Sequence, residues 1–380
     1  MKILFISHIL NNTGAPLVLM DAISVSINQG YHVDVVSMED GVLRERLEEK
    51  QVSVTIADDF LDNLAMWQRI FRKYDLVVAN TLLCLEAIYA LNTTEVKTIW
   101  WIHEHRAWFE AYKTVLPKKE DLKSNIHIFG VSPVTNELIR HYCGYETGLL
   151  PFGIEDRGKE IEIIRGDGYS GNLNAAKVKF IFPGTYSPVK GQDILCKAVE
   201  VLPDDIRSRC EFVLCGANVE GEEEYYSEIV NASRKFPEVS VKEVIPHDDT
   251  LRLMSRMDYV LVPSRMEPFS ATAVEGMMMG AVPIVSDICG VAYWLENGRD
   301  GFVFSSGNVE SLAETISKAV SIRDSSKLQY EQMVHDARRK YENMFSMEKF
   351  SATWCAMINQ KTMSDKGDDN EKSECDSTCI

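Results

Sequence analysis

Short apolar runs alternate with longer amphipathic stretches along most of this chain. In the first half the runs cover residues 2–7, 32–37, 75–79, 97–103 and 126–132. In the second half they cover residues 178–183, 210–215, 239–244, 258–263, 282–286 and 302–304. Apolar strands separated by helical segments are typical of parallel sheets that carry helices on both faces. The pattern therefore predicts an α/β protein with two doubly wound sheets.

A polar stretch without hydrophobic period separates the two halves. It contains the glycine-rich sequence Arg165-Gly-Asp-Gly-Tyr-Ser-Gly171, which we interpret as part of a linker. Near the end of the chain, Phe350, Trp354, Met357 and Ile358 fall on one face of a predicted amphipathic helix. The last residues are rich in Asp, Ser and Lys and are predicted to be disordered. The predicted boundaries are a first domain at 1–155, a linker at 156–177, a second domain at 178–346, the amphipathic helix at 347–360 and a tail at 361–380.

The segment Glu267-Pro-Phe-Ser-Ala-Thr-Ala-Val-Glu275 is the most informative part of the chain. It follows the apolar run 258–263, so Glu267 is expected in a strand-to-helix loop, Ser270 as the helix N-cap and Glu275 in the first helical turns. The amides of residues 270–273 would then be unpaired donors at the positive end of a helix, where phosphate binds readily. Eight helical residues span about 12 Å. That is roughly the length of the sugar–diphosphate–ribose part of a nucleotide-sugar, so one carboxylate could meet the sugar hydroxyls and the other the ribose.

Together with its neighbours, this segment closely resembles the Glu-x7-Glu signature of the retaining glycosyltransferases of family 4. The neighbouring matches are Pro263-Ser264-Arg265, the sequence at 280–286 and Glu296-Asn-Gly-Arg-Asp-Gly-Phe-Val303. The resemblance implies the GT-B fold, in which two Rossmann-like domains face each other across a cleft and the last helix crosses back onto the first domain. It is specific over residues 178–320 and looser in the first domain, which selects the acceptor in this family.

The loop Gly184-Thr-Tyr-Ser-Pro-Val-Lys190 follows the first strand of the second domain. In the family, an arginine and a lysine of this loop grip the donor diphosphate. Lys190 matches the lysine, but Thr185 stands where arginine is usual, so one phosphate cation is missing. Either Arg265 or backbone amides compensate for it, or donor binding is weaker.

The resemblance also assigns roles to single residues. Glu267 is expected to orient the transferred sugar, and Glu275 to bind ribose. His103, at the end of its strand, is expected against the donor sugar, and Ile245 is expected to contact the base through its backbone. The predicted catalytic residues are Glu267, His103 and Lys190. The predicted donor-binding residues are Gly14, Ala15, Gly184, Lys190, Gly216, Ile245, Arg265, Phe269, Ser270, Ala271, Thr272 and Glu275.

The sequence gives no indication of a metal or another cofactor. No Asp-x-Asp occurs anywhere in the chain, so no divalent ion is expected on the diphosphate. Charge on the leaving diphosphate would instead be met by Lys190 and the helix amides. In the family, retention is usually explained by attack on the same face of the sugar, with the leaving phosphate oxygen taking the acceptor proton.

Composition narrows the partners and the compartment. The formal net charge of −17 argues against nucleic acid as a partner, because no basic excess exists to neutralise phosphates. The nine cysteines show no CxxC or metal-ligand spacing and are expected as reduced thiols in a cytosolic protein. The apolar start at residues 1–7 is too short for a signal or a spanning helix. We therefore expect a cytoplasmic protein, with peripheral contact at the inner face of the membrane left open.

These observations predict a metal-independent, retaining hexosyltransferase that uses a nucleotide-sugar donor, with UDP favoured over GDP. The acceptor is expected to be a glycan or a lipid-linked glycan in cell-surface polysaccharide synthesis. The missing arginine keeps one alternative open, a non-catalytic partner subunit that binds a nucleotide-sugar within a glycosyltransferase pair.

Overall fold

The computed structural model describes residues 1–158 and 177–359. The strands of the first half are β1 (Lys2–Ser7), β2 (His32–Ser37), β3 (Ser53–Ile56), β4 (Leu76–Asn80), β5 (Thr98–Ile102), β6 (Ile126–Gly130) and β7 (Gly148–Leu149). Its helices are α1 (Gly14–Asn28), α2 (Leu43–Glu49), α3 (Leu64–Phe71), the short 3₁₀ helix η1 (Leu82–Cys84), α4 (Leu85–Leu91), α5 (Arg106–Tyr112) and α6 (Pro133–Cys143).

The second half repeats the alternation of strand and helix. Its strands are β8 (Val178–Pro183), β9 (Cys210–Cys215), β10 (Val239–Lys242), β11 (Tyr259–Val262), β12 (Val282–Ser286) and β13 (Phe302–Phe304). Its helices are α8 (Gln192–Val201), α9 (Asp204–Arg207), α10 (Glu223–Ser233), α11 (His247–Met254), α12 (Ala271–Met279), the 3₁₀ helix η2 (Gly290–Trp294) and α13 (Val309–Ser325). The chain then continues through α14 (Lys327–Lys340), the π-helix η3 (Tyr341–Phe345) and α15 (Met347–Asn359).

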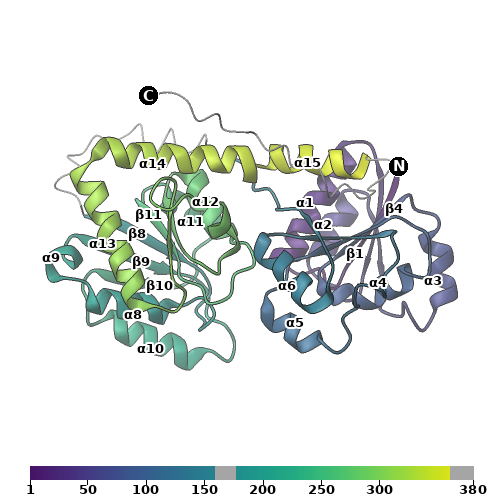
Figure 1. Ribbon diagram of the computed structural model, residues 1–380, viewed down its shortest axis with the longest axis horizontal. Coiled ribbons are helices and arrows are strands. Elements are labelled where there is room, and N and C mark those ends of the chain that lie inside the picture. Colours follow the sequence, from purple (N-terminus) through teal and green to yellow (C-terminus); the bar gives the residue numbers. More distant parts are fainter. Residues whose placement is uncertain (159–176, 360–380) are drawn as a thin grey trace, which may run out of the picture.

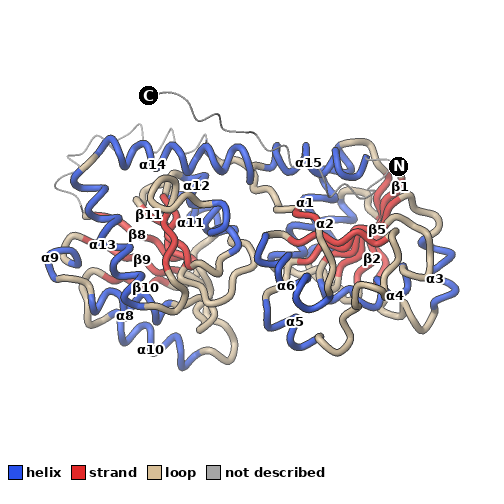
Figure 2. Tube along the Cα trace, in the orientation of Figure 1, coloured by secondary structure: helices blue, strands red, loops and turns tan. Residues whose placement is uncertain are grey.

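The two halves form two separate parallel sheets, each covered by helices, as Figure 1 and Figure 2 show. The first has seven strands in the order β3-β2-β1-β4-β5-β6-β7, and the second has six in the order β10-β9-β8-β11-β12-β13. Each order reverses beside the first strand of its sheet, which is the position where ligands bind in doubly wound folds. The predicted fold class, two Rossmann-like doubly wound sheets, is confirmed.

The prediction of single elements was wrong at three places. The strands β3 and β7 were missed, because β3 is mostly exposed and β7 has only two residues, so neither gives an apolar run. Both lie at the edges of the first sheet. After the loop at residues 11–16 the sequence predicts a helix from Leu17 to Ile27, but helix α1 begins at Gly14. Pro16 falls in its first turn, where a missing amide hydrogen costs nothing.

Helix α15 follows the second half in the chain but packs against the first half, and Figure 1 shows α14 beside the second sheet and α15 beside the first. The Trp354 indole is fully buried and donates a hydrogen bond of 3.0 Å to Ser26 Oγ of α1. Its ring lies 6.1 Å from that of Phe5 and 6.0 Å from that of Trp101. The predicted linker falls largely, and the predicted tail entirely, outside the described residues.

Candidate functional site

The loop between β11 and α12 is held in one conformation by backbone hydrogen bonds. The Gly290 amide donates to the Glu267 carbonyl oxygen at 2.9 Å, and the Val291 amide donates to the Phe269 carbonyl oxygen at 3.0 Å. Ser270 adopts a positive φ of 100° and caps α12, because its Oγ accepts from the Ala273 amide at 3.2 Å. Strain of this kind is characteristic of functional loops.

The capping geometry corrects one expectation about the phosphate site. Four amides, from residues 270–273, were expected to be free, but the Ala273 amide is already bonded to Ser270 Oγ. The amides of Ala271 and Thr272 open the helix and have no acceptor within it. These two amides lie at the positive end of α12 and are donors available to an anion.

Lys190 and Glu267, two of the predicted catalytic residues, are in direct contact. Lys190 Nζ lies 2.6 Å from Glu267 Oε2, and the two side chains are 32% and 15% exposed. The loops that carry them are joined, because the Arg265 amide donates to the Val189 carbonyl oxygen at 2.7 Å. Gly191 has a φ of 84°, in the left-handed region that favours glycine, and a Cβ there would overlap the Pro263 carbonyl oxygen. The structure thus places an ammonium group and a carboxylate together at the loop before the first turn of α12.

The guanidinium of Arg265 is bound to other protein groups. Its guanidinium donates two hydrogen bonds of 2.8 Å to the Asp193 carboxylate and one of 2.5 Å to the Pro188 carbonyl oxygen. Burial alone would raise the pKa of Asp193, but the bonds and the charge of Arg265 outweigh it and lower this pKa to about 2. Arg265 therefore keeps a neutralising partner within the protein. Compensation for Thr185 by the amides of α12, and weaker donor binding, both stay predictions.

Glu275 is the fifth residue of α12 and does not stand alone. His247 Nε2 lies 2.7 Å from Glu275 Oε1. Ile245, just before α11, is partly buried against the core. On the neighbouring loops, a Cβ on Gly216 would overlap the Gly184 carbonyl oxygen, so the turns after β8 and β9 approach each other closely.

The side chain of Phe269 is buried and cannot contact a ligand. Its ring lies 4.3 Å from Phe152, 6.0 Å from Trp294 and 5.5 Å from Phe345. These neighbours come from the end of the first half, from η2 and from η3. Only the backbone of Phe269 remains for the donor-binding role predicted for it, while its ring ties the loop to the junction of the two halves.

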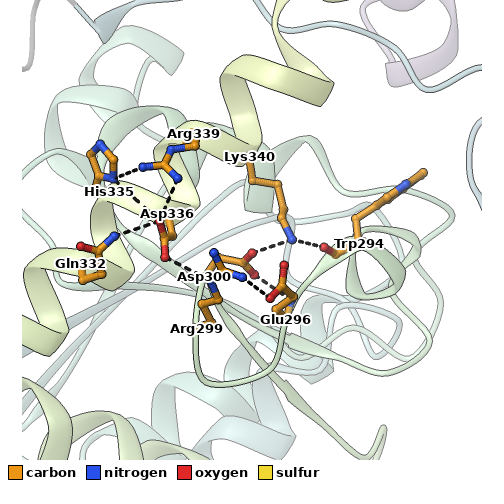
Figure 3. Close-up of polar contacts among 9 residues, drawn as sticks. All are labelled: Trp294, Glu296, Arg299, Asp300, Gln332, His335, Asp336, Arg339 and Lys340. Atoms are coloured by element: carbon orange, nitrogen blue, oxygen red, sulfur yellow. Dashed lines mark hydrogen bonds and ion pairs between the residues drawn. The ribbon is translucent and has the colours of Figure 1, made fainter. Parts of the chain in front are cut away.

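A polar network outside the site joins α14 to the end of η2 and to the loop that follows η2 in the chain, as Figure 3 shows. Lys340 of α14 lies 2.5 Å from the buried carboxylate of Asp300 and also donates to the Trp294 carbonyl oxygen. Arg299 bridges Glu296 at 2.6 Å and Asp336 of α14 at 3.2 Å. Because Trp294 packs on Phe269, this network supports the loop that carries Glu267.

His103 lies at the end of β5 in the first sheet, as predicted, but the contacts of its ring are those of a structural residue. Its ring lies 4.7 Å from that of Trp101, and its Nε2 is shielded from solvent without a hydrogen-bond partner among the described residues. Burial lowers the pKa of His103 to about 3, so its ring is neutral. The adjacent Glu104 carboxylate is buried and accepts from the amides of Leu82 at 2.9 Å and His103 at 3.0 Å. Burial raises the pKa of Glu104 to about 7.

His105 was missed in the sequence and faces the second half of the chain. Burial lowers its pKa, the charge of Glu267 opposes this change, and the charge of Lys190 adds to it. Its shielded Nδ1 has no hydrogen-bond partner among the described residues. The sequence signal was the pair of histidines around Glu104, but the approach to Glu267 depends on how the two sheets face each other.

His105 and Glu267 line a common cavity of about 570 Å³. Its walls come from α5 and α6 on one side and from the loops after β11 and β12 on the other. The other lining residues are Arg106, Val134, Glu137, Leu138, His141, Arg265, Met266, Pro268 and Ile288. The cavity thus places Glu267 at the wall between the two halves.

Gly14 and Ala15 form the first turn of α1, at the strand ends of the first sheet. A Cβ on Gly14 would meet no atom within 4 Å, and Asn80 Nδ2 donates to the Ala15 carbonyl oxygen at 2.9 Å. In residues 1–158 and 177–359, no three acidic, histidine or cysteine side chains gather in a way that could hold a metal ion. Within the same ranges, no helix has the length and apolar character that a bilayer span requires.

Two family models match the chain, one on each half. The model described as "Glycosyl-transferase family 4" matches residues 1–145, and the model described as "Glycosyl transferases group 1" matches residues 170–340. Among curated proteins, a glycogen synthase of Thermodesulfovibrio yellowstonii is 25% identical over 217 residues, which cover 56% of this chain. The match covers 41% of that synthase, so this chain spans less than half the length of such relatives.

The fold is also found in solved structures. The structure of Anabaena HepE in complex with UDP has a TM-score of 0.76 at 19% identity and covers 94% of this chain and 99% of that one. The structure of the same protein in complex with UDP-glucose has a TM-score of 0.71 at 20% identity, with the same coverage. At this level of identity the likeness shows the fold alone.

Proposed function

The chain belongs to the family 4 glycosyltransferases with the GT-B fold, and on this premise we propose that it transfers a sugar from a nucleotide-sugar with retention of anomeric configuration. The observation that carries the proposal is the contact of 2.6 Å between Lys190 and Glu267 at the start of α12. It joins a cation suited to phosphate with a carboxylate suited to sugar hydroxyls, and Glu267 lies in the loop that leads into α12, whose first two amides have no acceptor in the helix.

The donor fits this arrangement from one end to the other. Its diphosphate lies on the amides of Ala271 and Thr272 and on Lys190, which has three donors and spends one of them on Glu267. The transferred sugar meets Glu267, and the ribose meets Glu275 further along the helix. UDP is the favoured nucleotide, supported by the UDP and UDP-glucose complexes of Anabaena HepE, which shares this fold.

The reaction needs no protein nucleophile in this proposal. The acceptor oxygen forms a bond to the anomeric carbon while the bond from that carbon to the phosphate oxygen breaks. The proton of the acceptor hydroxyl goes to the leaving phosphate oxygen, on the same face of the sugar. Lys190 and the α12 amides stabilise the negative charge that grows on the diphosphate, so no metal is required.

The acceptor enters by the cavity between the two halves, next to Glu267. We propose a glycan or lipid-linked glycan acceptor and a role in cell-surface polysaccharide synthesis. The cytoplasm, with a peripheral contact at the inner face of the membrane, is the proposed place of the reaction. Seven described cysteines are free thiols, which supports a reducing compartment.

A second candidate function is a non-catalytic subunit that binds a nucleotide-sugar within a transferase pair. It is favoured by Thr185 in place of the usual arginine and by the pairing of Arg265 with Asp193. The test is a thermal-shift screen of the purified chain with UDP- and GDP-sugars, followed by an assay of nucleotide release from the donor that binds. Donor binding with nucleotide release supports an active transferase. Donor binding without nucleotide release in the presence of every acceptor tested supports a non-catalytic subunit, and absence of donor binding contradicts both functions.

A further inference from the structure

Two helix starts meet at the carboxyl edge of the second sheet. His247 is the first residue of α11, and Glu275 lies on α12, the next helix along the chain after the strand β11. The ring nitrogen Nε2 of His247 lies 2.7 Å from Oε1 of Glu275. This distance is that of a charge-assisted hydrogen bond. Through this hydrogen bond, the first residue of α11 fixes a side chain of α12.

The two partners differ strongly in exposure. The Glu275 side chain is 15% exposed and that of His247 is 65% exposed. Glu275 Oε2 has no hydrogen-bond partner among the residues that the structure describes. One carboxylate oxygen is thus bound to the protein, while the other remains for a ligand. Fixing a long side chain in this way removes rotamer freedom that a ligand would otherwise have to remove.

Three charged groups surround the His247 ring. They are Glu275 from α12, Asp248 from its own helix and Arg157 from the end of the first half, and Arg157 also contacts Asp248 at 3.2 Å. The hydrogen bond to Glu275 raises the pKa of His247, burial opposes this, Asp248 adds to it and Arg157 reduces it. His247 therefore keeps its proton to a higher pH than a free histidine and donates to Glu275.

We infer that His247 is a positioning residue that holds the Glu275 carboxylate in the orientation that binds the ribose of the donor nucleotide. The inference rests on the proposed function, because it takes Glu275 as the ribose ligand. His247 itself does not touch the donor in this arrangement. His247 affects donor binding only by orienting the Glu275 carboxylate. Replacing His247 should therefore have no effect on binding when Glu275 has already been replaced.

The experiment measures UDP affinity by calorimetry for the wild type, His247→Leu, His247→Gln, Glu275→Gln and the double variant His247→Leu/Glu275→Gln. Loss of one hydrogen bond to the carboxylate should weaken UDP binding about 2- to 12-fold in His247→Leu. His247→Gln keeps a donor at similar reach and should recover part of the loss. In the Glu275→Gln background, His247→Leu should have no further effect, because coupled residues do not add. His32→Leu, at an exposed histidine of β2 that contacts the Asp34 carboxylate at 3.2 Å, is the matched control and should bind as the wild type does.

A pH series separates positioning from a purely structural role. The difference between wild type and His247→Leu should be largest at about pH 6 and shrink by about pH 8.5, as His247 loses its proton. Comparing the two proteins at each pH cancels the titration of UDP itself. If His247→Leu binds UDP as well as the wild type, or if its effect adds to that of Glu275→Gln, this inference alone is wrong. A wild-type protein that does not bind UDP contradicts the proposed function and the inference with it.

Discussion

Replacing Lys190 with alanine tests the electrostatic part of the proposed mechanism most directly. Lys190 Nζ lies 2.6 Å from Glu267 Oε2, and Arg265, whose amide bonds to the Lys190 loop, is bound to Asp193 by two hydrogen bonds. Arg265 is therefore not free to replace Lys190. Loss of a charge-assisted contact to the diphosphate costs about 1.5–3 kcal/mol, which corresponds to roughly 10- to 150-fold in kcat/KM. Part of the loss should appear in kcat, because the charge on the diphosphate grows as it leaves.

The assay combines UDP release from UDP-glucose at steady state with UDP affinity by calorimetry. Lys197→Ala is the matched control, since Lys197 lies on α8, pairs with Asp193 at 3.3 Å and is largely exposed. Exposed pairs of this kind contribute little, so this variant should stay within about two-fold of the wild type. Kinetics of Lys190→Ala equal to those of the wild type would refute the reasoning, since they would show that other groups hold the diphosphate.

Three further predictions follow from the same site. Activity should change less than a few-fold in EDTA, and complete loss that magnesium or manganese restores would contradict the metal-free mechanism. Glu267→Gln should mainly lower the chemical rate while UDP still binds, whereas Glu275→Gln should weaken UDP and donor binding alike, and the reverse result would mean that the two roles are exchanged. Burial in the folded state raises the pKa of Glu104 to about 7 from an ordinary value of 4.5, so the folded protein binds more protons than the unfolded protein between these two pH values. The free energy of unfolding of the wild type should therefore fall as the pH rises from 4.5 to about 7, by about 1–3 kcal/mol relative to that of Glu104→Gln. Denaturant titrations of the two proteins measure this difference, and parallel pH profiles would contradict the prediction.

The strands of both sheets were predictable because their buried residues form continuous apolar runs. β4, β5, β11 and β12 are buried along their whole length, and each was found in the sequence within one or two residues. β3 and β7 were not, because an edge strand with exposed side chains has no distinct apolar pattern. The start of α1 was placed at Leu17, three residues too late, although Pro16 is compatible with a first helical turn.

The loop chemistry around α12 was predictable as far as local rules reach. Ser270 was identified as the N-cap from residue type alone, and its side chain does accept from the Ala273 amide. The same rule should have removed Ala273 from the set of free amides. What no local rule contains are the contacts between separate strand–helix units, which join Lys190 to Glu267 across 77 residues and His247 to Glu275 across 28.

These contacts change the physical picture of the site. Three carboxylates at this edge of the second sheet have cationic partners: Glu267 has Lys190, Asp193 has Arg265 and Glu275 has His247. In a chain with a formal net charge of −17, unpaired carboxylates here would repel a nucleoside diphosphate. The pairing leaves the acidic groups able to accept hydrogen bonds from sugar and ribose hydroxyls while their repulsion of the diphosphate is reduced.

The same pairing would let the proposed donor bind without the usual arginine at Thr185. If the carboxylates are neutralised by their own partners, the diphosphate needs less positive charge than in an open acidic site. The fixed dipoles of the Ala271 and Thr272 amides can then supply part of the attraction, because they are already oriented and cost no reorganisation during the reaction. Donor affinity in this chain should thus depend on the geometry of the α12 start more than on the number of basic side chains around it.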